Sequence, residues 1–191
     1  MDNLIITRQK NFIFEIVLNR PEKRNALNLS IMQQFDEALQ KAEQAKDARA
    51  ILIRGEGRAF SAGIDVTGLP EMAAHFGIDL SKNLFPVTRY LQGIFNRLEN
   101  CSLPSIALLH GHCLGMGFEL ALACDFRIVA EGTQLGLPET RLGLIPDVGG
   151  TTRLVRLAGF GRAKELIITG RRFGPDEAER WGLVNEIVAE D

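Results

Sequence analysis

The sequence has few cysteines and no pattern that suggests disulfides. Its 191 residues include three cysteines, Cys101, Cys113 and Cys124, and no two of them form a C-x-x-C pair. An odd number of scattered thiols is typical of a reduced, intracellular protein rather than a disulfide-stabilised one.

Excess charge and long apolar runs are also absent, and no targeting segment is expected. The formal net charge is −2, and the basic residues are scattered among acidic ones. The chain therefore has no electrostatic signature of nucleic-acid binding. No apolar run reaches the roughly 18 residues that a membrane span needs. The start, MDNLIITRQKN, resembles neither a signal nor a transit peptide, so we expect a cytoplasmic location and no membrane partner.

Common nucleotide and hydrolase motifs do not occur. Two glycine-rich segments, 55–65 and 111–117, lack the third glycine of a dinucleotide fingerprint at the required spacing. The sequence contains no G-K-[ST] of a P-loop, and Ser61 does not lie in G-x-S-x-G.

A metal site is an unfavoured alternative. His110, His112 and Cys113 could ligate a metal only with further donors, and the sequence offers no second ligand cluster. We therefore expect no metal and no redox cofactor.

Apolar strand-like and helical segments alternate along the chain, which predicts an α/β layered fold in one domain, residues 1–191. We expect one helix that begins at Ser30 as its N-cap, a second around Tyr90 to Leu98 and a third after Gly115. We expect residues 68–84 to be mobile or substrate-facing. The remaining expected elements are strands at 4–7, 12–18, 50–53, 105–109, 126–130, 134–137 and 184–188, and helices at 151–157, at 162–169 and from Pro175.

The stretch HGHCLGMGFELALACD, residues 110–125, places Glu119 in an otherwise apolar helix. An unpaired carboxylate costs several kcal/mol to bury. Glu139 and Asp147 also have apolar neighbours and follow prolines. Two such carboxylates that met in one pocket would split their pKa values and form an acid–base pair. The alternatives are a helix-dipole role for Glu119 and turn or cap chemistry for the other two.

The helix that begins near Gly115 would leave free N–H groups at its start. Two such glycine junctions that converged would make an oxyanion hole. For either junction alone, a tight turn is the simpler interpretation.

Several segments together resemble the crotonase superfamily, the enoyl-CoA hydratases and isomerases. They are ITRQKNFIFEIVLNRPEKRNALN, GRAFSAGIDV, PSIALLHGHCLGMGFELALACDFRIVAE, GLPETRLGLIPDVGGTTRLVRLAG and GRAKELIITGRRFGPDEAERWGLVNEIV. The resemblance covers nearly the whole chain. It implies a crotonase-like (ClpP/crotonase) spiral of ββα units with two roughly perpendicular sheets.

The resemblance also implies residue roles. Ile64 and Met116 match the backbone oxyanion donors, and Glu119 and Glu139, 20 positions apart, match the two catalytic glutamates of hydratases. CoA-binding positions match Arg24, Ala26, Ala62 and Ile64. The implied activity is the addition of water across the 2,3 double bond of an enoyl-CoA thioester, with the thioester as substrate and no cofactor.

Two features keep alternatives open. Asp147 matches an acid that the dienoyl-CoA isomerases of the superfamily carry, so double-bond isomerisation is the second expectation and thioester hydrolysis a weaker third. Compared with the superfamily, we expect the C-terminal helical trimerisation segment to be missing or truncated here. We expect a homotrimer or hexamer if that segment or a substitute is present, and a truncated, weakly active acyl-CoA-binding protein is a further alternative function.

Overall fold

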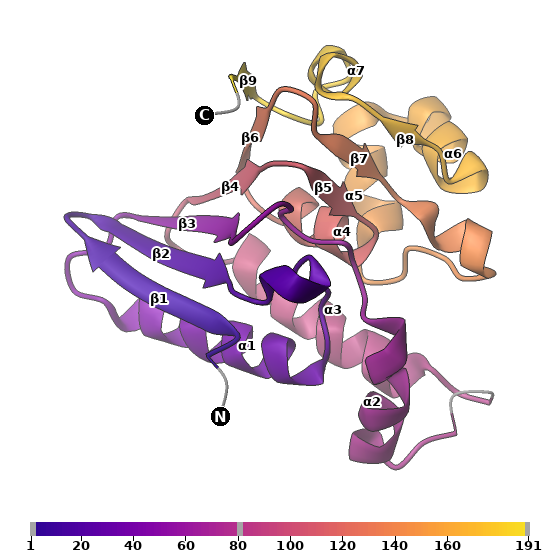
Figure 1. Ribbon diagram of the computed structural model, residues 1–191, viewed down its shortest axis with the longest axis horizontal. Helices are drawn as coiled ribbons and strands as arrows, with labels where there is room; N and C mark the ends of the chain where they lie inside the picture. Colours follow the sequence, from indigo (N-terminus) through magenta and orange to yellow (C-terminus); the bar gives the residue numbers. More distant parts are fainter. Residues whose placement is uncertain (1–2, 80–81, 190–191) are drawn as a thin grey trace.

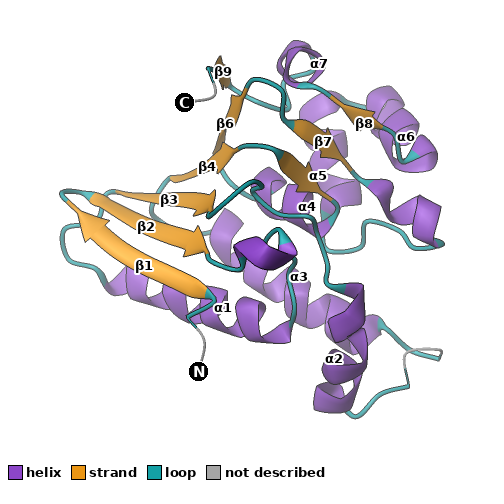
Figure 2. Cartoon of the chain, viewed as in Figure 1, coloured by secondary structure: helices purple, strands orange, loops and turns teal. Residues whose placement is uncertain are grey.

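The computed structural model describes residues 3–79 and 82–189. The single domain predicted for residues 1–191 also includes residues 1–2, 80–81 and 190–191, which lie outside the described part. It has a six-stranded sheet in the order β1-β2-β3-β4-β6-β9 and a three-stranded sheet in the order β5-β7-β8 (Figure 1). Helices and strands alternate throughout (Figure 2), which confirms the α/β expectation.

The large sheet begins with an antiparallel hairpin and continues with parallel strands. Strand β1 pairs antiparallel with β2, and β2, β3, β4, β6 and β9 then pair in parallel. The strands are β1 (Ile5–Lys10), β2 (Ile13–Leu18), β3 (Ala50–Gly55), β4 (Ser105–Leu109), β6 (Phe126–Ala130) and β9 (Glu186–Val188). The small sheet consists of β5 (His112–Leu114), β7 (Gln134–Gly136) and β8 (Arg172–Phe173).

The helices cover these sheets and join them. They are α1 (Leu29–Gln44), α2 (Leu69–Phe76), α3 (Phe85–Glu99), α4 (Met116–Leu122), α5 (Gly150–Ala158), α6 (Phe160–Thr169) and α7 (Pro175–Arg180). Three 3₁₀ segments occur: η1 (Pro21–Lys23), η2 (Val66–Gly68) and η3 (Pro138–Leu142). No helix among the described residues combines the length and apolarity needed to cross a membrane.

Apolar periodicity explains most of these elements. In α1 the residues Ile31, Phe35, Ala38 and Ala42 are spaced at helical intervals, and all are buried. In β3 alternate residues are buried, as a strand's period of two requires. These side chains join the aromatic rings of α3 and α4 in one core.

Several local expectations were wrong. The N-cap of α1 is Asn28, whose side chain accepts a hydrogen bond from the Ile31 N–H, and Ser30 lies inside the helix. No helix was expected within residues 68–84, but residues 69–76 form α2; residues 80–81 of that segment lie outside the described part of the chain. The short strands β5 and β8 were not predicted, because two or three residues carry no recognisable periodicity.

Candidate active site

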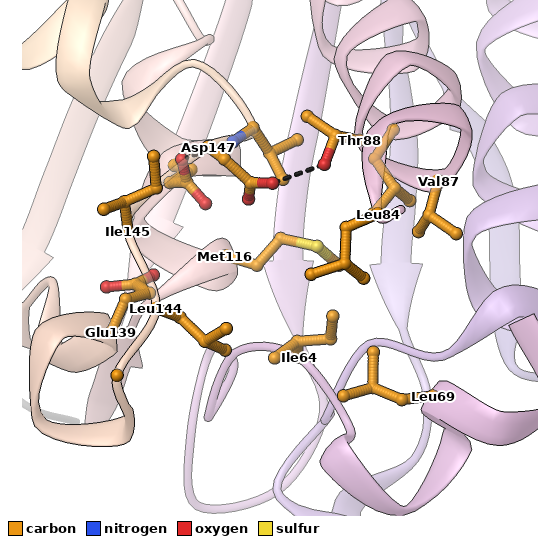
Figure 3. Close-up of a pocket in the computed structure, with 14 residues that line it drawn as sticks. Ile64, Leu69, Leu84, Val87, Thr88, Met116, Glu139, Leu144, Ile145 and Asp147 are labelled. Carbon is orange, nitrogen blue, oxygen red and sulfur yellow. Dashed lines mark hydrogen bonds between the residues drawn. The ribbon is translucent and has the colours of Figure 1, made fainter. Parts of the chain in front are cut away.

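One cavity collects most of the residues that the sequence singled out. Its volume is about 260 Å³, and it lies between the α2–α3 segment, the start of α4 and the chain from η3 to α5 (Figure 3). The lining residues are Ile64, Leu69, Leu84, Val87, Thr88, Leu91, Met116, Glu119, Glu139, Gly143, Leu144, Ile145, Asp147 and Val148. The walls are thus mainly apolar, with carboxylates among them.

Glu119 lies in the first turn of α4 and is 1% exposed. Its Oε1 accepts hydrogen bonds from the backbone N–H groups of Val148 (2.9 Å) and Gly150 (2.8 Å). Burial, together with the nearby Glu139 and Asp147 carboxylates, raises its pKa to about 8 against the opposing effect of these two hydrogen bonds.

Glu139 lies in η3 and is 9% exposed. Neither of its carboxyl oxygens has a hydrogen-bond partner within the described part of the chain. Burial, reinforced by Asp147, raises its pKa to about 7. A buried polar group without a partner is costly, so this arrangement indicates a functional rather than a structural role.

Asp147 lies on the same cavity and is partly buried. Its carboxylate accepts a hydrogen bond from the Thr88 hydroxyl of α3 (Figure 3). Three carboxyl groups therefore share one apolar cavity, and burial together with the neighbouring carboxylates favours the protonated forms of Glu119 and Glu139. This is the chemistry that a proton-transferring site requires.

The two glycine junctions also meet at the cavity. A Cβ on Gly63, whose φ is +95°, would lie 2.7 Å from Leu114 O and 3.4 Å from Met116 N, so only glycine permits this approach. The N–H of Gly63 donates to Ser61 Oγ. In contrast, the N–H groups of Ile64 and Met116 have no acceptor among the described residues.

Three of the four predicted CoA-binding residues, Arg24, Ala26 and Ala62, are not part of the cavity lining. The Ala62 N–H donates to the Arg24 carbonyl at 2.9 Å, so the two segments are adjacent. Arg24 and Ala62 are exposed and Ala26 is half-buried. Of the four residues, Ile64 alone lines the cavity, and the CoA-binding role of all four stays a prediction.

The alternative metal site gains no support from the geometry. His110 Nε2 lies 2.9 Å from the Gly57 carbonyl, and Cys113 is fully buried in the core. Among the described residues, no group of three potential ligands could hold a metal ion.

Sequence reasoning identified some cavity residues only as part of a broad segment. Leu69 and Leu84 belong to residues 68–84, which were expected to be mobile or substrate-facing, and both line the cavity, in agreement with the second alternative. The spacing of Leu69, Met72 and Phe76 was the available signal for the helix α2. Thr88 carried no signal, because a threonine on a helix surface is unremarkable until its partner is known.

Comparison with known proteins identifies the family. Residues 8–191 match the family model described as enoyl-CoA hydratase/isomerase. A short-chain-enoyl-CoA hydratase of Clostridium acetobutylicum is 37% identical over 97% of this chain and 69% of its own length. The human mitochondrial enoyl-CoA hydratase domain-containing protein 2 is 40% identical over 94% of this chain and 59% of its own length.

Solved structures agree with these matches. An enoyl-CoA hydratase from Bacillus anthracis has a TM-score of 0.87 and 38% identity over 97% of this chain and 70% of that one. One from Thermoplasma volcanium has a TM-score of 0.87 and 34% identity over 99% of this chain and 73% of that one. The chain thus spans about 60 to 70% of the length of most of these relatives. It belongs to the enoyl-CoA hydratase/isomerase family of enzymes.

Proposed function

We propose that this protein adds water across the 2,3 double bond of an enoyl-CoA thioester. Glu119 and Glu139 hold the water and exchange its protons: one carboxylate acts as base and one carboxylic acid delivers a proton to C2. The observation that carries this proposal is the Glu139 carboxyl, which is buried in the cavity and finds no hydrogen-bond partner for either oxygen among residues 3–79 and 82–189. A water held by Glu119 would satisfy it.

The backbone N–H groups of Ile64 and Met116 form the oxyanion hole in this proposal. They lack acceptors among the described residues, and a Cβ added to Gly63 would lie 3.4 Å from Met116 N, so the two junctions are close together. Hydration adds electron density to the thioester carbonyl oxygen. Two preorganised donors would stabilise that charge without a metal, so we propose that the enzyme needs no cofactor.

The CoA part of the substrate would lie on the surface formed by Arg24, Ala26 and Ala62, next to Ile64. The acyl part would enter the apolar cavity of about 260 Å³. The name of the Clostridium relative, a short-chain-enoyl-CoA hydratase, makes crotonyl-CoA the first substrate to test.

Double-bond isomerisation of an enoyl-CoA or dienoyl-CoA is the second candidate, and Asp147 is the observation that favours it. This third carboxylate lines the cavity with the two glutamates. Three acids could pass a proton along a longer conjugated chain, whereas hydration needs two.

We also propose assembly into a homotrimer or hexamer and a location in the cytoplasm. Exposed apolar side chains support the assembly, because such surface is usually covered by a partner. Four of them on or near η3 and α6 are more than 60% exposed: Leu142, Ile145, Phe160 and Ile168. A weakly active acyl-CoA-binding protein is the remaining alternative. Turnover of a short enoyl-CoA distinguishes it from an enzyme.

An ultraviolet assay with crotonyl-CoA, a 3-enoyl-CoA and a dienoyl-CoA, run side by side, tests the proposal. We expect loss of the conjugated-thioester absorbance with crotonyl-CoA and unchanged rates after treatment with a chelator. Turnover of the dienoyl-CoA alone would favour the isomerase. Binding of all three without turnover would favour the acyl-CoA-binding protein.

A further inference from the structure

A buried arginine lies on the side of residues 147–150 that faces away from the cavity. Arg153, in α5, has a side chain that is only 4% exposed. Its guanidinium donates to Glu99 Oε2 (2.7 and 3.0 Å), to Asn96 Oδ1 (2.7 Å) and to the Val148 carbonyl (3.2 Å). Each of the three guanidinium nitrogens therefore donates at least one hydrogen bond, and one of these bonds reaches the backbone next to the cavity.

The same short segment holds Glu119 from its other side. Val148 and Gly150 direct their N–H groups at Glu119 Oε1, whereas the Val148 carbonyl accepts from Arg153. Gly149, between them, has a φ of +104°, and a Cβ there would lie 1.9 Å from Arg153 Nη1. The guanidinium thus packs directly against the peptide groups that orient the carboxylate.

Helix α3 provides the fixed support for this segment. Thr88, Gln92, Asn96 and Glu99 lie at intervals of three and four residues, so they share one face of the helix. Thr88 donates to the Asp147 carboxylate and Gln92 to the Asp147 carbonyl. The other two anchor Arg153.

We infer that Arg153 is a positioning residue for Glu119, acting through residues 148–150 and supported by α3. The inference rests on the proposed catalytic role of Glu119. Without the guanidinium, the Val148 carbonyl loses a donor and residues 148–150 lose the group they pack against. The two N–H bonds to Glu119 then lengthen, and the carboxylate is no longer held where the water needs it. Arg153 itself does not line the cavity, so substrate binding stays intact.

Arg153→Met and Arg156→Met form a matched pair for the test. Both remove an arginine of α5 that is paired with Glu99, but the Arg156 side chain is 68% exposed and lies 3.4 Å from Glu99 Oε1. With crotonyl-CoA we expect Arg153→Met to lower kcat by about 10²-fold at nearly unchanged KM, since small displacements in an active site cost that much. Arg156→Met should stay within about twofold of the wild type, as expected for an exposed ion pair.

A second readout does not depend on turnover. Carbon-13 NMR of glutamate-labelled protein follows the titration of the Glu119 carboxyl, assigned with Glu119→Gln. In Arg153→Met this carboxyl should titrate at higher pH than in the wild type, because weaker N–H bonds favour its charged form less. The groups that also face it, Glu139 and Asp147, are the same in both proteins.

Asn96→Ala protects the test against a folding failure. Asn96 is exposed, and its loss leaves Arg153 paired with Glu99; we expect smaller changes in kcat and titration in the same direction. A folded Arg153→Met variant with the kcat and the Glu119 titration of the wild type would overturn the inference. If Arg153→Met does not fold, an Asn96→Ala variant with unchanged kcat and unchanged Glu119 titration would overturn it instead. If the wild type turns over no thioester, the proposed function fails, and the titration of Asn96→Ala, which keeps the Arg153 charge, decides whether Arg153 positions Glu119.

Discussion

The two sides of residues 147–150 treat buried ionisable groups in opposite ways. On the side away from the cavity, Arg153 has carboxylate, amide and carbonyl partners for its guanidinium. On the cavity side, Glu139 has no hydrogen-bond partner for either oxygen in the part of the chain that the structure describes, and Glu119 uses one oxygen for two backbone donors. The first arrangement is what a stable fold requires of a buried charge.

The second arrangement is poor for stability and well suited to proton transfer. Apolar walls and neighbouring carboxyl groups raise the pKa of Glu119 to about 8 and that of Glu139 to about 7. Both values lie near neutral pH, where an acid and a base can exchange roles. Under the proposed mechanism, the hydrogen-bonded Arg153 would support the site and the carboxyl groups of the cavity would transfer protons.

The largest effect should follow from changes on the cavity side. Glu119→Gln and Glu139→Gln preserve size but remove proton transfer, so each should lower hydration turnover by about 10²-fold or more. Binding of the CoA thioester should change far less, because the proposed oxyanion donors are backbone N–H groups. Steady-state kinetics and calorimetric titration with a substrate analogue measure the two quantities. Full turnover in both variants would remove the glutamates from the mechanism.

The pH dependence of hydration should be bell-shaped. Below about pH 7 the pair becomes fully protonated and lacks a base, and above about pH 8 it becomes fully ionised and lacks an acid. The rate should therefore peak between these values and fall about tenfold per pH unit well outside them. A kcat profile from pH 5 to pH 10 tests this, with protein stability checked at both ends. A flat profile would contradict the paired-acid mechanism.

Asp147→Asn separates the two candidate reactions. The amide can keep the hydrogen bond with Thr88, but it cannot carry a proton. A hydratase should lose only about threefold in turnover, well below the roughly 10²-fold expected for a general acid or base. A dienoyl isomerase should lose nearly as much as with a glutamate change. The same three thioesters, assayed with wild type and variant in parallel, provide the measurement.

Apolar periodicity predicted much of the fold, and carboxylates in otherwise apolar segments predicted the candidate site. Apolar spacing predicted α1 and the central strands because their buried faces dominate those segments. Glu119 attracted attention because a carboxylate in an apolar helix is costly, and it does lie in the cavity with Glu139 and Asp147.

The supporting contacts were beyond sequence reasoning. Arg153 lies in a helix whose pattern allows an exposed arginine, and its burial depends on Glu99, 54 positions away. Thr88 and Asp147 are 59 positions apart. Such pairs exist only after α3 and residues 147–150 have packed together, so no local pattern records them.

The smallest expected effect concerns stability, and its sign differs between the two sides. The pKa of Glu119 is raised from 4.5 in the unfolded chain to about 8, so the folded state binds the extra proton between these values. Stability therefore falls as the pH rises from 4.5 to 8. Glu119→Gln keeps an acceptor for Val148 and Gly150 and removes this loss, so it should raise the melting temperature at pH 8.5 and have little effect near pH 4.5.

Glu99→Gln is the matched change on the other side. It removes the charge that pairs with the buried Arg153 guanidinium, and Gln offers only a neutral acceptor in its place. Because Glu99 is itself 36% exposed, we expect a loss of about 1 to 2 kcal/mol rather than the larger cost of breaking a fully buried pair. Thermal melts of both variants at pH 4.5 and 8.5 should thus give shifts of opposite sign at the higher pH. Destabilisation of Glu119→Gln at pH 8.5 would mean that its carboxylate supports the fold, and the contrast between the two sides would disappear.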